Sequence, residues 1–381
     1  MRVKYLKWEN TVIGVINSDY SVDFTDVNNI PGFEVLPKDN HWTSQQFQKF
    51  LNDRVLSSGR RDIEKILFRC GLSAYNVFAV ADKTKAVNAK DLFWMSNDAD
   101  EKFENAITDV FESVFIKHTD MTGDSINTPD GCNVKRYGCY NGKYGIYKKR
   151  LHPLSGDVES EVAVYKLANR IGVPCCRAVK VDDDTVFSEF QYNFAQEQIV
   201  HFRRLFEGDT QRGGNELMNL IGKRPQYKND FYKMIFLDFL TLQDDRHLSN
   251  LAMKVNLKTK QESFYPLYDN GRSLFYQDTA ETIAKAADNP IDYCTTFGNE
   301  GSYYDYVCDI LSEDINNVKL VDLSVSEDEI YDILKESGFK NERLFGSVTW
   351  IKNSMECITI LSQKLQNGDI KSDASSLDIQ M

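Results

Sequence analysis

The stretch "TLQDDRHLSNLAMKV" (residues 241–255) places two aspartates, an arginine, a histidine and an asparagine between two apolar segments. A second polar group, "YDNG" (268–271), follows after a short polar turn at 256–262. Polar groups between packed apolar elements are costly unless hydrogen bonds or a ligand satisfy them. The pattern therefore indicates either a self-contained hydrogen-bond network or a site that binds a ligand.

The overall composition is that of a soluble globular protein. Apolar residues make up 42% of the 381 residues and charged residues 27%, which is ordinary for this class. The length suffices for two domains. No apolar stretch approaches the roughly 18 residues of a membrane span, and "MRVKYLKWEN" lacks the apolar core of a signal peptide. We therefore expect a cytoplasmic protein without membrane contact.

The charge and the cysteines exclude two further classes. The net charge of −12 opposes direct binding to nucleic acid, which is itself negative. One basic cluster, "VKRYGCYNGKYGIYKKR" (134–150), fits a smaller anion such as a phosphorylated ligand. The eight cysteines are not at zinc-ligand spacing, so we expect no structural metal.

The first part of the chain reads as a small α+β module. Alternating apolar and polar residues predict a β-hairpin over 1–24, with its turn at Glu9-Asn10. Apolar residues at helical spacing predict helices over 43–56, 60–71 and 101–115. We place the end of this module near residue 118.

The remaining chain first alternates strands and helices and then becomes mainly helical. A Gly/Ser/Thr-rich loop is predicted over 122–138. Further predicted elements are a strand at 143–151, a helix within 158–174 that ends at Gly172, and strands at 177–181 and 185–190. A buried helix at 229–243, two strands at 251–255 and 263–269 that flank the turn at 256–262, and helices within 278–366 follow. Residues 367–381 are predicted to form a flexible tail.

The order of these elements matches the parts that phosphoryl transfer requires, namely a phosphate-binding loop, a lysine and glutamate pair, a base and metal ligands. Asp245 is the candidate that orients or deprotonates an acceptor hydroxyl. Asn250 follows five positions later, the separation found in kinase catalytic loops. Asn250 and Asp269 offer hard oxygen ligands suited to Mg²⁺, and the strand pair between them should bring them side by side.

These residues also carry a resemblance to a known family. "DDRHLSN" with "YDNG" resembles the active-site signature of the HipA-like serine/threonine kinases, which are related in fold to the phosphoinositide 3-kinase-like kinases. "DSINTPDG" (124–131) resembles the phosphate loop of that family. The resemblance implies that Ser125 and Gly131 lie near the ATP phosphates, and that Ser125 is a candidate autophosphorylation site.

The resemblance assigns the remaining nucleotide contacts. "GIYK" implies Lys148 as the lysine on the phosphates, although Lys149 stays open because a one-residue shift reverses the face of a strand. "ESEVAVYKLANRIGVP" implies Glu161 as the acidic partner, with Glu159 as its rival. "VFSEF" implies that Glu189 and Phe190 border the adenine.

The predicted roles of two neighbours of Asp245 are less specific. His247 supports the site or serves as a core histidine bonded to backbone. Arg246 is interpreted as a solvated or salt-bridging residue.

The predicted architecture is an α+β, bilobal protein-kinase-like fold. Its parts are the N-terminal α+β module (1–118), a small mixed N-lobe (119–195), a mainly helical C-lobe (196–366) and the tail (367–381). The predicted function is transfer of phosphoryl groups from ATP, with Mg²⁺, to serine or threonine hydroxyls of a protein. The resemblance further implies a toxin–antitoxin setting with a DNA-binding antitoxin partner. The alternatives are a kinase for a small molecule or lipid, and a non-catalytic nucleotide-binding regulator.

Overall fold

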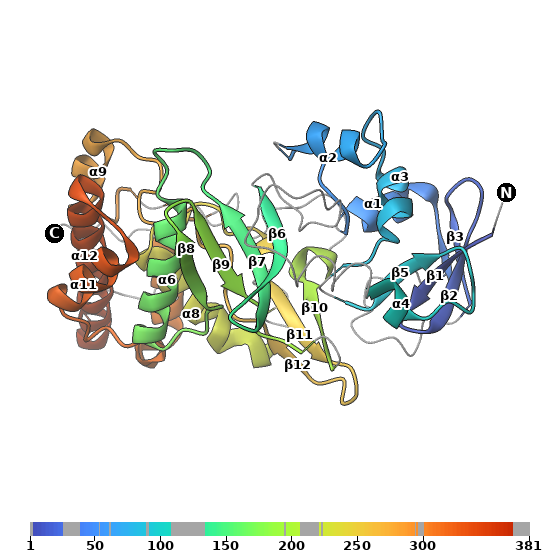
Figure 1. Cartoon of the computed structure of the whole chain (residues 1–381). Helices are drawn as coiled ribbons and strands as arrows, with labels where there is room; N and C mark the ends of the chain where they lie inside the picture. Colours follow the sequence, from blue (N-terminus) through green and yellow to red (C-terminus); the bar gives the residue numbers. More distant parts are fainter. Residues whose placement is uncertain are drawn as a thin grey trace. The chain divides into compact units, whose positions relative to one another are not determined.

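The computed structural model places most of the chain. The residues it describes are 3–25, 39–52, 54–60, 62–88, 91–107, 134–193, 196–205, 221, 224–293, 295 and 301–368. The chain divides into two compact units, whose elements are labelled in Figure 1. The first comprises Met1–Leu151, Asp184–Val200 and Met253–Glu262, and the second comprises His152–Asp183, His201–Ala252 and Ser263–Met381.

A five-stranded antiparallel sheet opens the first unit. Its strands are β1 (Lys4–Trp8), β2 (Thr11–Ile16), β3 (Val22–Phe24), β4 (His41–Trp42) and β5 (Phe93–Ser96), in the order β4-β3-β2-β1-β5. The β1–β2 pair confirms the predicted hairpin, with Trp8 opposite Thr11. Glu9 adopts a left-handed φ of 49°, which a tight hairpin turn requires.

Four helices accompany this sheet: α1 (Ser44–Asn52), α2 (Ile63–Arg69), α3 (Val77–Thr84) and α4 (Phe103–Ile107). The first two confirm predicted helices, and α4 lies within the range of the third, of which residues 108–115 lie outside the described residues. Before α1, Thr43 and Gln46 form a reciprocal capping box, because each side chain accepts a hydrogen bond from the other residue's backbone N–H. Phe47 and Leu51 of α1 are fully buried in the core of this region.

One ion pair is enclosed in the core of the first unit. The guanidinium of Arg54 donates two hydrogen bonds of 2.7 Å to the carboxylate of Asp91. It also donates to the carbonyl oxygens of Ala86 (3.0 Å) and Phe93 (2.6 Å). Both charged side chains are almost completely removed from solvent. Such a pair is stable only while every donor keeps a partner.

Strands β6 (Lys135–Tyr140), β7 (Lys143–Lys149) and β9 (Thr185–Glu189) lie side by side in the first unit, with β7 in the middle. β7 and β9 confirm predicted strands. Gly138 of β6 lies opposite Gly145 of β7. A Cβ on Gly138 would come within 2.2 Å of the Tyr147 ring, and one on Gly145 within 2.2 Å of the Ser188 carbonyl oxygen. Both positions therefore need glycine for close packing.

A smaller sheet has the order β10-β11-β12, formed by Glu197–His201, Ala252–Asn256 and Glu262–Phe264. β11 and β12 flank the polar turn, as predicted. β12 is shorter than the predicted strand because the chain changes partner after Tyr265, whose N–H still bonds to the Ala252 carbonyl (2.9 Å). Leu267 forms an isolated parallel bridge with Cys175 instead.

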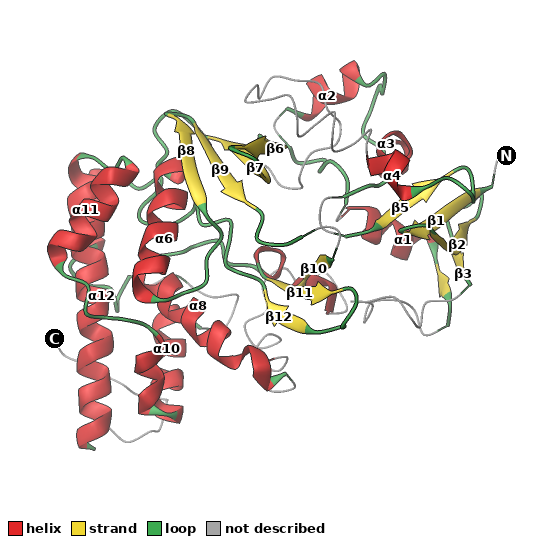
Figure 2. Ribbon diagram, turned by 60° about the horizontal axis from the view of Figure 1, so that its bottom comes forward, coloured by secondary structure: helices red, strands yellow, loops and turns green. Residues whose placement is uncertain are grey.

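The second unit is mainly helical (Figure 2). Its helices are α6 (Asp157–Ile171), α8 (Lys228–Leu240), α9 (Ala280–Ala286), α10 (Tyr303–Glu313), α11 (Glu327–Ser337) and α12 (Asn341–Asn367), and it also contains strand β8 (Ala178–Asp182). Short 3₁₀ turns are η2 (Phe202–Leu205), η3 (Pro225–Tyr227), η4 (Leu248–Asn250) and η5 (Ile315–Leu320). α11 packs against both α6 and α12.

The two helices next to the candidate site, α6 and α8, agree with the predictions from the sequence. α6 ends at Gly172, whose φ of 80° is the left-handed cap that the sequence predicts. α8 is buried from Phe231 to Leu240, apart from Lys233, as its nearly continuous apolar character predicts. The predicted mixture of helices and sheets is therefore confirmed. Among the described residues, no helix is long and apolar enough to span a membrane.

We expect Arg54→Met to destabilise the first unit by about 3–5 kcal/mol, since it leaves the Asp91 carboxylate buried without its cation. Urea unfolding followed by tryptophan fluorescence would measure this, because three of the four tryptophans (Trp8, Trp42 and Trp94) belong to this unit. Arg170→Met, which removes an exposed ion pair with Asp322, is the control and should have a much smaller effect. Equal losses for the two variants would contradict the expectation.

Candidate active site

The polar stretch 241–250 begins where the buried helix α8 ends. Thr241 closes the helix, with its backbone N–H bonded to the Leu237 carbonyl, and Leu242 turns the chain through a left-handed φ of 48°. The backbone N–H of Gln243 then returns to the Asp238 carbonyl (3.0 Å). The Gln243 side chain accepts a hydrogen bond from the N–H of Asp245 (2.9 Å). Local bonds therefore define the direction in which the chain leaves α8.

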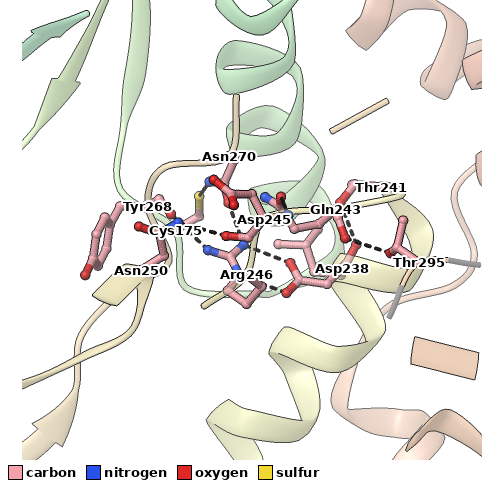
Figure 3. Close-up of polar contacts among 11 residues, drawn as sticks. Cys175, Asp238, Thr241, Gln243, Asp245, Arg246, Asn250, Tyr268, Asn270 and Thr295 are labelled. Carbon is pink, nitrogen blue, oxygen red and sulfur yellow. Dashed lines mark hydrogen bonds and ion pairs between the residues drawn. The ribbon is translucent and has the colours of Figure 1, made fainter. Parts of the chain in front are cut away.

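Arg246 lies at the centre of a buried network (Figure 3). Its guanidinium donates two hydrogen bonds of 2.8 Å to the carboxylate of Asp238 in α8. It also donates to the Tyr268 carbonyl (2.9 Å) and to Oδ1 of Asn270 (2.7 Å). Burial alone would lower the pKa of Arg246, but the Asp238 carboxylate outweighs burial and raises it. The arginine is therefore a fixed cation that joins two polar segments.

Asp245 and Asn250 are held together within one turn. The Nδ2 group of Asn250 donates to the backbone carbonyl of Asp245 (2.9 Å), and Asn250 is buried. Because this bond uses the nitrogen, the amide oxygen is the end left for a ligand. The half-buried carboxylate of Asp245 lies 3.5 Å from Nε of Arg272. Burial alone would lower the pKa of Arg272, but the negative charge of Asp245, together with that of Asp244 and Asp269 and the effect of Tyr276, raises it.

Asp269 is reached through an extended segment that is anchored on both sides. Leu267 exchanges backbone hydrogen bonds with the segment 174–176, through Pro174 (3.0 Å) and Cys176 (2.8 Å). The Tyr268 hydroxyl donates to the carbonyl of Ser249 (2.9 Å). Residues adjacent to Asp269 and to Asn250 are therefore directly bonded. Burial and the neighbouring Asp269 carboxylate raise the pKa of Tyr268, which keeps this hydroxyl a donor.

Glu161 lies on α6 beside the same segment. A Cβ on Gly271 would be 3.5 Å from Cγ of Glu161 and 3.3 Å from the Asp157 carbonyl oxygen. The Ser160 hydroxyl donates to the Ser273 carbonyl (2.8 Å), which attaches α6 to the residues after Asp269. The rival Glu159 instead forms an ion pair with Lys180 (3.1 Å). Of the two glutamates, Glu161 is thus the one that packs against the glycine of "YDNG".

The predicted nucleotide-binding residues other than Glu161 lie in the first unit or outside the described chain. On β7, Lys148 is 7% exposed, whereas Lys149 is half-buried. Glu189 ends β9 opposite Gly145, and the Phe190 backbone N–H donates to the Tyr144 carbonyl (2.9 Å). Ser125 and Gly131 lie outside the described residues.

Residues that we did not predict for the site connect the predicted ones. Asp238, Tyr268, Asn270 and Cys175 join Arg246 in one hydrogen-bonded set, in which Asn270 donates to Sγ of Cys175 (3.3 Å). Arg246 itself is one of the predicted alternatives, a salt-bridging residue. The available signal was Asp238, a lone aspartate inside the apolar sequence "MIFLDFL". A carboxylate there must find a buried partner.

The donor set is compatible with Mg²⁺ bound together with a phosphorylated ligand. Asn250 presents an oriented amide oxygen, and Asp269 supplies a half-buried carboxylate on the adjoining segment. Mg²⁺ commonly takes one or two protein oxygens and completes its shell with water and phosphate. Within the described part of the chain, no group of three or more His, Cys, Asp and Glu side chains is arranged as a metal site.

Comparison with known proteins adds a finding at the level of the fold. No family model and no curated protein sequence matches this chain. HipA of Shewanella oneidensis, solved as a toxin–antitoxin complex with HipB and operator DNA, matches with a TM-score of 0.61 and 14% identity over 96% of this chain and 99% of HipA. The proinflammatory kinase CtkA of Helicobacter pylori matches with a TM-score of 0.52 and 16% identity over 64% of this chain and 94% of CtkA.

These likenesses confirm the predicted fold class, and they confirm the resemblance in fold that the two short motifs indicated. The chain has the α+β fold of the HipA-like kinases.

Proposed function

We propose that this protein is a kinase that transfers the γ-phosphoryl group of ATP to serine or threonine hydroxyls of a protein. The observation that carries the proposal is the bonded pair of loops in the second unit. One loop contains Asp245 and Asn250, the other contains Asp269, and the Tyr268–Ser249 hydrogen bond joins them. In a kinase fold, this is the residue set that phosphoryl transfer needs.

The carboxylate of Asp245 has the role of orienting the acceptor hydroxyl and accepting its proton. The guanidinium of Arg272 lies 3.5 Å from this carboxylate and places an opposite charge beside it. The backbone of Asp245 is fixed by the Asn250 amide, so the carboxylate is presented from a rigid turn. Rigid presentation lowers the entropic cost of aligning the two reactants.

Asn250 and Asp269 would hold Mg²⁺ through the amide oxygen and the carboxylate. When bound, the metal neutralises negative charge on the transferring phosphoryl group. Lys148 binds the ATP phosphates, together with the loop that contains Ser125 and Gly131. Glu161 keeps its predicted role as the acidic partner of this lysine.

Glu189 and Phe190 border the adenine in this proposal, and Ser125 remains the candidate autophosphorylation site. His247 supports the turn that contains Asp245. We also propose that the kinase is the toxin of a toxin–antitoxin pair with a DNA-binding antitoxin partner, since HipA was solved with HipB and operator DNA. The net charge of −12 supports indirect contact with DNA, through such a partner.

We expect Asp245→Asn and Asp269→Asn each to reduce phosphoryl transfer by about 10³-fold or more, because each removes charge required at the reacting groups. The assay uses labelled ATP with the purified protein and a cell lysate, followed by mapping of phosphosites on all proteins. Asp244→Asn is the matched control, since it makes the same change at the exposed neighbour of Asp245.

Transfer by the control but not by the two site variants is the expected result. Label that appears only on small molecules or lipids would replace the protein acceptor with the alternative substrate class. Binding of Mg·ATP by the wild-type protein without transfer to any acceptor would instead identify a non-catalytic regulator. Undiminished transfer by Asp245→Asn would contradict the role given to that carboxylate.

The two neighbouring lysines of β7 provide a second prediction. We expect Lys148→Met to lower kcat/KM for ATP by about 100-fold, or roughly 2.7 kcal/mol of transition-state stabilisation. Lys149→Met should leave it within a few-fold of wild type, because Lys149 is the more exposed residue. Steady-state kinetics over a range of ATP concentrations measures both. A large loss in Lys149→Met alone would move the nucleotide lysine to position 149.

A further inference from the structure

We propose that Arg246 is a positioning residue that holds Asp269 in place as a ligand for a divalent cation. This role rests on the proposed function and adds to it a residue that itself touches neither nucleotide nor metal. Its guanidinium donates to the carbonyl of Tyr268 (2.9 Å) and to the side chain of Asn270 (2.7 Å). Arg246 therefore holds the residue before Asp269 and the residue after it.

Asp269 needs such support because of its backbone. Its φ is 58°, in the left-handed region that residues other than glycine rarely occupy. A strained conformation of this kind persists only where the surrounding structure enforces it. Arg246 binds the peptide carbonyl before this position and the Asn270 side chain after it, and a change in φ would displace at least one of these two acceptors.

The guanidinium is also anchored to the buried helix α8. Asp238 receives two hydrogen bonds of 2.8 Å from Arg246, and both side chains are fully buried. Asp238 belongs to α8, a helix whose surrounding residues are almost all buried. The segment around Asp269 is therefore tied to the helix core.

Arg246 also couples the two proposed metal ligands to each other. Its backbone belongs to the turn that Asn250 closes onto Asp245, while its side chain binds the segment of Asp269. Together with the Tyr268–Ser249 hydrogen bond, Arg246 thus sets the spacing between the amide oxygen of Asn250 and the carboxylate of Asp269. A longer or mobile connection would leave the two ligands independent, which lowers metal affinity.

Asn270 completes the arrangement from the opposite side. Its Nδ2 group donates to Sγ of Cys175 (3.3 Å). This bond orients the amide so that Oδ1 faces the guanidinium. Loss of the Asn270 side chain should therefore weaken the positioning of Asp269 while the Arg246–Asp238 pair remains intact.

The first unit contains a pair that separates positioning from stability. Arg54 binds Asp91 through two hydrogen bonds and donates to two further acceptors, as Arg246 does with Asp238. Both pairs are buried. Arg54 makes these contacts within the first unit and has no part in the proposed site. Matched substitutions in the two pairs should thus cost similar stability but differ in their effect on metal binding.

The test compares Arg246→Lys, Asn270→Ala and the double variant Asp238→Leu/Arg246→Met with Arg54→Lys and Asp91→Leu/Arg54→Met. The double variants remove both charges together, which preserves folding better than leaving one charge buried. The measurement is Mn²⁺ binding by electron paramagnetic resonance, in the presence of a non-hydrolysable ATP analogue. Urea unfolding and the Mg²⁺ dependence of ATP turnover are recorded in parallel.

We expect Mn²⁺ affinity to fall by about 10–100-fold in the Arg246 and Asn270 variants and to stay unchanged in both Arg54 variants. In Arg246→Lys, raising the Mg²⁺ concentration should restore much of kcat, a separation that general destabilisation would not produce. If the Asp238→Leu/Arg246→Met protein does not fold, Asn270→Ala decides the result, because it keeps the ion pair.

Equal Mn²⁺ affinity in the Arg246, Asn270 and Arg54 variants would show that Arg246 has only a structural role. That result would leave the proposed kinase function intact, provided that the wild-type protein binds Mn²⁺ with the analogue and turns over ATP. A wild-type protein that does neither would instead overturn the proposed function, and the role of Arg246 with it.

Discussion

The second unit depends on a buried ion pair between Arg246 and Asp238. Removing two charges from water is costly, and the cost is recovered only when every donor and acceptor finds a partner. Arg246 meets this condition by bonding to α8, to the Tyr268 carbonyl and to the Asn270 side chain. Helix α8, the turn that contains Arg246 and the segment 268–270 must therefore converge before this cation is satisfied. The same requirement brings the candidate site together.

The chain uses this device twice, with different consequences. In the first unit, Arg54 lies just after α1 and binds Asp91. Its guanidinium also bonds to Ala86, just after α3, and to Phe93 of β5. In the second unit, an equivalent pair joins a helix to two loops that contain the residues proposed for phosphoryl transfer. The chemistry of the two pairs is the same. The two pairs differ in the segments that they join, since only the pair in the second unit joins segments that contain the proposed site residues.

Much of the fold was predictable because local patterns determine it. Alternation predicted β7 and the first hairpin, while glycine at the end of α6 and the apolar length of α8 predicted those helices. The spacing of Asp245, Asn250 and Asp269 indicated the site. The role of Arg246 was not predictable, since tertiary contacts decide whether a charged side chain is buried. The same holds for Lys148 against Lys149, and for the early end of β12. The roles of all the site residues stay predictions, and Ser125 and Gly131 also lie outside the described residues.

The central claim is that the two loops held by Arg246 present one shared cation site. The most direct measurement is a crystal structure with Mn²⁺ and a non-hydrolysable ATP analogue, with the metal located by its anomalous scattering. The account predicts an anomalous peak in direct coordination to Oδ1 of Asn250 and to the carboxylate of Asp269. A peak bound to neither side chain, with the analogue present, would contradict it.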